Sequence, residues 1–153
     1  NMVVEFENLI FFTRLINGDY IDYNRIIIKN HKITVKAQKQ EILAALEKAS
    51  LITEEKIPGN SRSHVKIEAI GDLFKVSAVS PAGSIYDEFN IEHSGEDITI
   101  AFNNRFFMDS IRACRGDKIK ISMSSPRMSI NIEPCDEESG SELFMLLPVR
   151  TRD

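Results

Sequence analysis

Hydrophobic and polar residues alternate in short segments from residue 32 onward, and this alternation is twice replaced by a helical spacing. Strand-like alternation begins at Ile33 and begins again at Ile98, 65 residues later. Apolar residues then recur at the i, i+1, i+4 spacing of one helix face, first over 38–51 and then from about Asn103 to Gly116. Three more alternating segments follow each helix. The pattern therefore predicts two successive β-α-β-β-β units.

The two units are related by fixed offsets, which indicate an internal duplication. The helix-face residues keep the offset of 65, so that Ile42, Leu43 and Leu46 correspond to Phe107, Met108 and Ile111. After the helices the offset is 54, and the predicted strands are 64–68, 73–80 and 84–90 in the first unit and 118–123, 127–133 and 143–148 in the second. The loop 57–63 absorbs the difference. Two such units predict an α+β domain in which two helices share one face of sheets built by both halves.

Residues 1–28 stand outside this duplication. Val3–Phe6 and Leu9–Leu15 have the composition of two strands, and Glu7-Asn8 between them favours a hairpin. A hairpin without a sheet beside it has unpaired edges and exposed apolar side chains. We therefore expect this segment either to pack on a neighbouring molecule or to be poorly ordered.

Composition limits the possible functions. A chain of 153 residues with 42% apolar residues suits one domain, and its net charge of −4 argues against tight nucleic-acid binding by bulk electrostatics, although not against a locally basic face. The longest apolar runs are far shorter than a membrane span, and no leader precedes them, so a soluble, cytoplasmic protein is expected. Cys114, Cys135 and three scattered histidines lack metal-ligand spacing, which predicts reduced thiols, no metal and no cofactor.

A small cytoplasmic α+β enzyme is the alternative that composition leaves open. Phosphate-binding, hydrolase and zinc-protease motifs are absent from the sequence. The possible reactive groups are Cys114 and surface carboxylates such as the Asp87-Glu88 pair. Cys114 falls on the apolar face of the second helix, which favours a buried structural thiol. Adjacent strand residues point to opposite faces, so Asp87 and Glu88 are not expected to share a substrate. An apolar pocket around Cys114 or perturbed carboxylates would favour the enzyme, whereas an apolar pocket elsewhere would favour a binding protein.

Two segments carry a resemblance to a known family. Phe12-Thr13-Arg14-Leu15-Ile16-Asn17-Gly18-Asp19-Tyr20-Ile21-Asp22-Tyr23-Asn24-Arg25-Ile26-Ile27 and Phe144-Met145-Leu146-Leu147-Pro148-Val149-Arg150 resemble two signatures of the bacterial sliding clamp, the beta subunit of the replicative DNA polymerase. The resemblance implies the sliding-clamp fold, with 1–28 as the tail of domain two plus the interdomain connector and 29–153 as domain three. Ile21 and Ile28 depart from the family, because many clamps have Pro there, which would fix the backbone φ angle.

The resemblance also implies a function without catalysis. Sliding clamps are processivity factors: two three-domain subunits form a homodimeric ring around duplex DNA. Replicative polymerase, clamp loader and repair factors dock short peptides in a groove between domains two and three. Matched to this chain, the groove residues are Ile21, Arg25, Ile26, Ile57, Asn103, Phe106, Arg127, Ser129, Met145, Leu146, Leu147, Pro148, Val149 and Arg150. Arg105 and Arg112 are the candidate DNA-facing residues, and they form only a weak basic signal because Asp109 lies between them. No membrane partner is implied.

Overall fold

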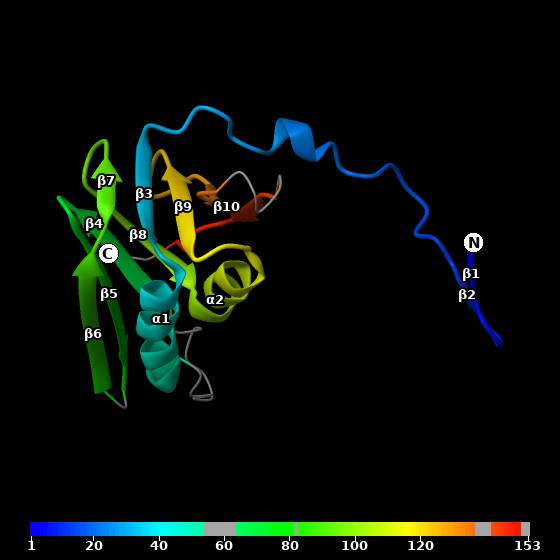
Figure 1. The fold of residues 1–153 in the computed structure, drawn as a ribbon, viewed down its shortest axis with the longest axis horizontal. Coiled ribbons are helices and arrows are strands. Elements are labelled where there is room, and N and C mark those ends of the chain that lie inside the picture. Colours follow the sequence, from blue (N-terminus) through cyan, green and yellow to red (C-terminus); the bar gives the residue numbers. More distant parts are fainter. Residues whose placement is uncertain (54–63, 82, 137–141, 151–153) are drawn as a thin grey trace.

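Two sheets and two helices form the body of the chain, and an N-terminal arm extends away from it (Figure 1). The computed structural model describes residues 1–53, 64–81, 83–136 and 142–150. Residues 33–146 hold all the buried hydrophobic side chains of this described part, whereas residues 1–26 hold none. The arm is therefore not part of the hydrophobic core.

The predicted duplication is confirmed. The first unit comprises β3 (Ile33–Gln38), α1 (Lys39–Thr53), β4 (His64–Ile70), β5 (Leu73–Ser80) and β6 (Gly83–Asn90). The second comprises β8 (Ile98–Asn103), α2 (Asn104–Ala113), β9 (Lys118–Met123), β10 (Ile130–Pro134) and β11 (Phe144–Leu146). The short strand β7 (Glu92–Ser94) lies between the units. β3 and β8 have the same length and keep the offset of 65 residues at both ends.

Each sheet combines strands from both units. One has the order β11-β10-β9-β3-β7 and the other the order β6-β5-β4-β8, so the first strand of each unit completes the sheet of the other. The register repeats as well, because Val35 lies opposite Ile121 in the β3–β9 pair and Ile100 lies opposite Ile67 in the β4–β8 pair. These four side chains are equivalent under the two sequence offsets, and all are buried. The duplication therefore extends to the pairing of individual residues.

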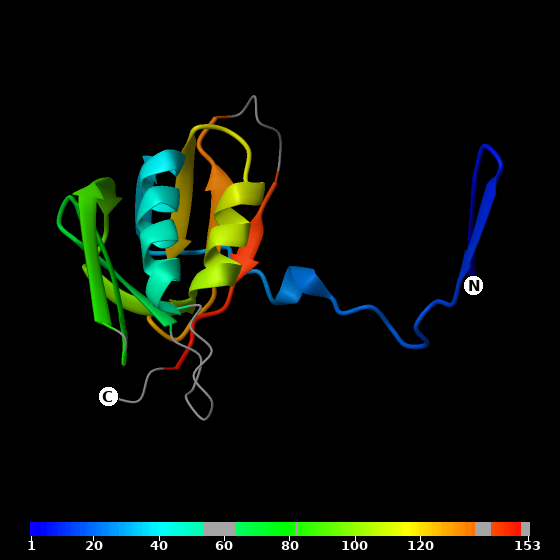
Figure 2. The same cartoon turned by 90° about the horizontal axis from the view of Figure 1, so that it is seen from below.

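The helices lie side by side and cover the inner faces of the sheets (Figure 2). α1 packs mainly against β5 and β6, and α2 packs against β8 and β11. Ile42 and Leu46 on α1 and Phe107 and Ile111 on α2 are almost fully buried, as the helical spacing predicts. Fully burying one such side chain stabilises the fold by about 1.5–3 kcal/mol.

Several details differ from the sequence-based expectation. β11 covers only Phe144–Leu146 of the predicted strand 143–148, so Leu147 and Pro148 follow the strand. β10 begins at Ile130, so Arg127 and Ser129, which were expected on this strand, precede it in a turn closed by a 3.3 Å hydrogen bond from Met128 N to the Ser125 carbonyl. Pro126 lies inside this turn and has no N–H for a strand ladder. The second helix ends at Ala113, and Gly116 with φ of 79° lies in the turn that follows.

Strand β7 was not predicted, because its three polar residues have no strand-like hydrophobic pattern. It pairs with β3 and is followed by Gly95, whose φ is 107°. A Cβ atom at Gly95 would lie 2.5 Å from the Lys32 carbonyl oxygen. Glycine therefore permits the close approach between this turn and the start of β3.

The arm begins with the predicted hairpin. β1 (Met2–Phe6) and β2 (Leu9–Thr13) pair antiparallel, and β2 ends two residues before the expected Leu15. Their apolar side chains are largely exposed, and the hairpin lies far from the two-sheet body (Figure 1). Whether it packs on a neighbouring molecule or becomes disordered stays a prediction. A single 3₁₀ turn, η1 (Tyr23–Arg25), lies between the hairpin and the body.

Candidate functional site

The C-terminal strip, defined as residues 145–150, holds exposed apolar side chains on an anchored backbone. Leu146 is buried and lies opposite Ile130 in the β10–β11 pair. Three residues later, Val149 N donates a 2.8 Å hydrogen bond to the Ala101 carbonyl of β8. Between these two anchors, Leu147 is 65% exposed. The strip therefore bridges the two sheets and presents an apolar side chain to solvent.

The start of α2 lies beside the second anchor of the strip. Asn103 follows Ala101 by two residues and caps the helix, because its Oδ1 accepts a 3.2 Å hydrogen bond from Phe106 N. Phe106, in the first turn, is 57% exposed. The predicted positions of Asn103 and Phe106 at the helix start are confirmed. One end of the domain thus combines Val149, Phe106 and the helix cap.

The turn before β10 lies beside the middle of the strip. Ser129 is buried and directly precedes Ile130, the residue paired with Leu146. Arg127 and Met128, earlier in the same turn, are exposed. Ser129 can therefore contribute to the floor beside the strip, whereas Arg127 can contribute only at the rim.

The predicted connector residues lie on the arm and not against the strip. Ile21 is 68% exposed and Ile26 is 44% exposed. The Arg25 Nε atom lies 3.0 Å from Asp22 Oδ2, within the arm itself. The structure places Asn103 two residues after Ala101, which binds Val149, and Ser129 directly before Ile130, which pairs with Leu146. Ile21, Arg25 and Ile26 lie apart from these residues, on the arm. Ile57 lies outside the described residues.

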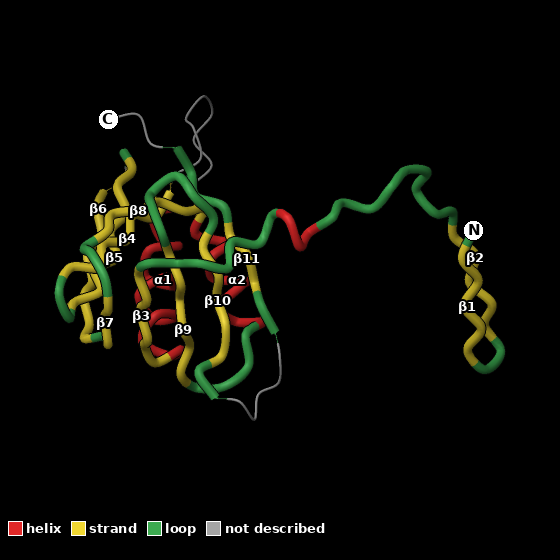
Figure 3. The backbone as a smooth tube through the Cα atoms, turned by 90° about the horizontal axis from the view of Figure 1, so that it is seen from above, coloured by secondary structure: helices red, strands yellow, loops and turns green. Residues whose placement is uncertain are grey.

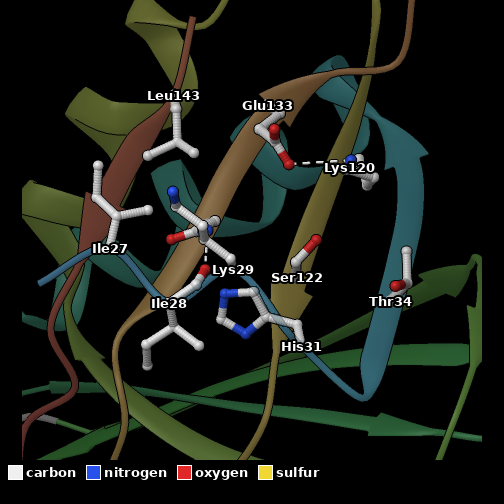
Figure 4. A pocket seen from close by; sticks show the side chains of 10 residues that line it. Ile27, Ile28, Lys29, His31, Thr34, Lys120, Ser122, Glu133 and Leu143 are labelled. Carbon is white, nitrogen blue, oxygen red and sulfur yellow. Dashed lines mark hydrogen bonds and ion pairs between the residues drawn. The ribbon is translucent and has the colours of Figure 1, made fainter. Parts of the chain in front are cut away.

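A cavity of about 390 Å³ lies on the outer face of the five-stranded sheet, where the chain enters β3 (Figure 4). None of the expected groove residues lines it. Its walls come from the chain entering β3 and from β3, β9, β10 and residue 143, namely Ile27, Ile28, Lys29, His31, Thr34, Lys120, Ser122, Asn131, Glu133 and Leu143. Lys120 Nζ and Glu133 Oε2 form a 2.9 Å ion pair at its edge. The cavity is mainly polar, and it lies neither beside Leu147 nor around the candidate reactive groups.

Asn131 is the residue of this region that sequence reasoning missed. Asparagine on the solvent side of an antiparallel strand is ordinarily exposed, and the alternation Ile130-Asn131-Ile132 suggests such a position. The side chain is instead 4% exposed, because the chain entering β3 covers it. No local sequence signal indicates this cover.

The two candidate DNA-facing arginines are already paired with acids. Arg105 Nε lies 3.9 Å from Asp109 Oδ2, and Arg112 Nη2 lies 3.0 Å from Glu47 Oε1 on the neighbouring helix. Across both helices, four Lys and Arg side chains stand against three carboxylates. The helix surface is therefore only weakly basic.

The groups considered for an enzyme are poorly suited to catalysis. Burial raises the pKa of the Cys114 thiol to about 11, so the reactive thiolate is scarce at neutral pH. Asp87 pairs with Lys48 of α1 at 2.7 Å, whereas Glu88 accepts a hydrogen bond from Tyr86 on the outer face of β6. The two carboxylates therefore point to opposite faces, as expected.

Metal-ligand clusters and membrane-spanning helices are both absent from the described part of the chain. The His, Cys, Asp and Glu side chains of these residues form no group of three or more that could hold a metal ion. Among the same residues, no helix is both long and apolar enough to cross a membrane.

Known proteins resemble this chain over nearly its whole length. The model of the family described as "DNA polymerase III beta subunit, C-terminal domain" matches residues 24–148. The beta sliding clamp of Streptococcus pneumoniae TIGR4 is 32% identical over 147 residues, covering 95% of this chain and 38% of the relative. That of Staphylococcus epidermidis RP62A is 27% identical over 146 residues, covering 94% of this chain and 37% of the relative.

Solved structures of the same family also share the fold of this chain. The DNA polymerase III beta chain of Streptococcus pneumoniae superposes with a TM-score of 0.84 at 28% identity, covering 97% of this chain and 39% of the other. The DNA polymerase sliding clamp of Bacillus subtilis gives 0.83 at 25% identity, covering 98% and 39%. The chain thus spans less than two fifths of the length of these relatives. Since the family model covers the duplicated units and the strip through Pro148, the chain belongs to the family formed by the C-terminal domain of the DNA polymerase III beta subunit.

Proposed function

We propose that residues 29–153 are the third domain of a sliding clamp and that residues 1–28 are the end of the second domain with its connector. The separation of the described body from the arm supports this division, because the buried core begins at Ile33. The exposed hairpin supports it too, since an apolar two-stranded segment is marginally stable without a sheet or helix to cover it.

The proposed role is that of a processivity factor without catalysis. Two three-domain subunits would form a ring around duplex DNA in the cytoplasm, and replicative polymerase, clamp loader and repair factors would bind to it through short peptides. The observation that carries the proposal is the apolar C-terminal strip held beside the start of α2. Leu147 and Phe106 remain exposed there although the backbone on both sides of Leu147 is anchored.

Such a surface suits a peptide with apolar anchors. Peptide sites are mainly apolar and use a few polar groups to fix the register. Leu147, Pro148 and Val149 would supply apolar area. Because Asn103 Oδ1 already accepts a hydrogen bond from the helix, Asn103 would bind the peptide through its Nδ2 group. Arg150 would contribute a second polar contact at the rim.

A fluorescence-polarisation titration tests this docking role. A labelled peptide carrying Leu and Phe anchors is titrated with the chain, with a Leu147→Asp variant and with Leu51→Asp as the matched control. Leu51 is also exposed, at 78%, but lies on α1. We expect weak but saturable binding, because this chain lacks most of domain two, and we expect Leu147→Asp to abolish it and Leu51→Asp to retain it. Equal loss in both variants, or no saturable binding up to about 1 mM, would contradict the proposal.

The DNA role would depend on the ring and not on this chain alone. The paired arginines and near balance of charges on the helices leave few free cations for phosphates. We expect the isolated chain to bind duplex DNA no more tightly than about 10⁻⁶ M at physiological salt, the limit of ordinary non-specific binding. A tighter salt-dependent complex in the same polarisation assay would refute this account of the DNA contact.

A further inference from the structure

The strap, defined as residues 27–31, carries the chain across the outer face of the five-stranded sheet before it enters β3 (Figure 3). Three hydrogen bonds hold it and the next residue. Asn131 Nδ2 of β10 donates to the Ile28 carbonyl at 2.8 Å, and the His31 ring Nδ1 lies 3.1 Å from Ser124 Oγ. Lys32 N donates to the Met123 carbonyl at 3.1 Å. The strap is therefore fastened along its length to the strands β9 and β10 and the turn between them.

Among these contacts, the Asn131 bond is the first that the arm makes with the body. Before Ile28, the hydrogen bonds recorded for the described arm outside the hairpin are local, such as those of Arg25 and Ile27 to Asp22 and Tyr23. All the described residues from 14 to 26 are exposed. The direction in which the arm leaves the domain is consequently set where Asn131 holds Ile28.

Asn131 also belongs to the strand that positions the C-terminal strip. In the β10–β11 pair it lies directly opposite Met145, the first residue of the strip. Its backbone is thus part of the ladder that holds the strip, while its side chain holds the strap on the outer face of the same sheet. One buried residue therefore connects the C-terminal strip to the strap, which directly follows the expected connector residues Ile21, Arg25 and Ile26.

We propose that Asn131 is a positioning residue that fixes the connector relative to the C-terminal strip, so that residues 21–26 and the strip face the same peptide. The proposal rests on the docking role proposed above. The physical basis is the cost of leaving the Ile28 carbonyl without its buried donor, which favours release of the strap into water. Without the bond, the strip would remain in place while the arm sampled many directions.

Distances between two spin labels measure this directly. Labels are attached at Asn24→Cys on η1 and Thr99→Cys on β8, both exposed, in a Cys135→Ser background. Cys114 can stay, because it is fully buried and burial raises its pKa to about 11. The variants are Asn131→Ala, which removes the donor, and Asn131→Asp, which keeps the shape but directs a carboxylate toward the Ile28 carbonyl.

Ser122→Ala is the matched control. Ser122 lies opposite Asn131 on β9, is similarly buried and lines the same cavity, but the recorded bonds of the strap do not involve it. We expect a narrow distance distribution for the parent and the control. In both Asn131 variants, the population of released arm conformers should rise about fivefold or more, as expected for losing one buried hydrogen bond.

Two additional readouts separate positioning from simple support of the fold. Amide hydrogen exchange at the β11 residues whose N–H groups face β10 reports the β10–β11 ladder, and it should stay as slow in Asn131→Asp as in the parent. Peptide affinity should fall severalfold in that variant. An unchanged distance distribution in both variants would overturn the proposal, and so would loss of the ladder in both, because Asn131 would then support the strand itself. If the parent binds no peptide but the arm is released, the docking role fails and the positioning role stands.

Discussion

The helix cap at Asn103 permits a test that separates the stability of the site from its binding chemistry. Asn103→Ala removes the Oδ1 acceptor that receives Phe106 N, and this leaves one N–H at the start of α2 without its side-chain partner. Loss of an asparagine cap typically costs about 1 kcal/mol, within a range of about 0.5–2 kcal/mol. The bond is exposed and 3.2 Å long, which places the expected loss near 1 kcal/mol rather than at the upper limit.

Asn103→Ser keeps an acceptor at the cap but removes the amide Nδ2. We expect its free energy of unfolding to stay within about 0.5 kcal/mol of the parent, because serine is as good a cap as asparagine. If Asn103 binds the peptide through Nδ2, the serine variant should nevertheless lose peptide affinity. The alanine variant should lose both stability and affinity.

Urea unfolding followed by circular dichroism measures the stability differences, and the polarisation titration measures the affinities. For a domain of this size, a loss of 1 kcal/mol lowers the melting temperature by about 2–4 °C, which provides an independent check. Gln38→Ala is the matched control, since Gln38 is exposed and occupies the equivalent position before α1. An unchanged urea midpoint in Asn103→Ala, or equal destabilisation by serine and alanine, would refute the capping argument.

Four further predictions concern the core, the two thiols and one turn. Leu46→Ala, at a fully buried position of α1, should lower the free energy of unfolding by about 2–5 kcal/mol, whereas Leu51→Ala on the exposed side of the same helix should change it by less than about 0.5 kcal/mol in urea titrations. In the folded chain a thiol reagent should modify half-buried Cys135 before Cys114, and equal rates would contradict the burial argument. Burial raises the pKa of Cys114 from 9.0 to about 11, so the thiol of the unfolded chain ionises first as the pH rises. The free energy of unfolding should therefore fall between about pH 9 and pH 11. A Cys114→Ala variant should lack this part of the decline. Gly95→Ala should lower the melting temperature, since its Cβ would lie 2.5 Å from a backbone oxygen at a φ of 107°, and an unchanged value would show that the turn relaxes freely.

The parts of the fold that follow local periodicity could be predicted from the sequence. The alternation starting at Ile33 and Ile98 and the helix faces around Leu46 and Ile111 reflect a requirement that each element satisfies alone, namely one buried face. The duplication then predicted sheets built by both halves, and the structure shows that the units achieve this by exchanging their first strands. Of the expected site, the positions of Asn103 and Phe106 also followed from a local signal, the start of a helix.

The remaining features depend on contacts between distant segments. Asn131 is buried because a strap 103 residues earlier in the chain covers it, and nothing near position 131 encodes that cover. Strand β7 likewise depends on its partner β3, since it has only three residues and all of them are polar. The connector residues Ile21 and Arg25 were matched to a groove. In the structure they are exposed on the arm and do not pack against the described body. Their expected contacts therefore remain predictions.

The duplication also explains why the candidate docking surface forms at only one of two equivalent places. β3 pairs with β7 along its outer edge, and at the equivalent edge of β8 the Ala101 carbonyl accepts a hydrogen bond from Val149. Ala101 corresponds to Lys36, which pairs with β7, so the C-terminal strip occupies for β8 the position that β7 occupies for β3. The helices that follow these strands differ, however, because Phe106 in the first turn of α2 corresponds to Glu41 in α1. The polar strand β7 covers one edge, and the helix after β3 carries a glutamate; the apolar strip covers the other, and the exposed phenylalanine in the helix after β8 suits an apolar peptide. If this reasoning is correct, Phe106→Glu should abolish peptide binding while preserving the fold, since the first unit tolerates glutamate at the same helical position.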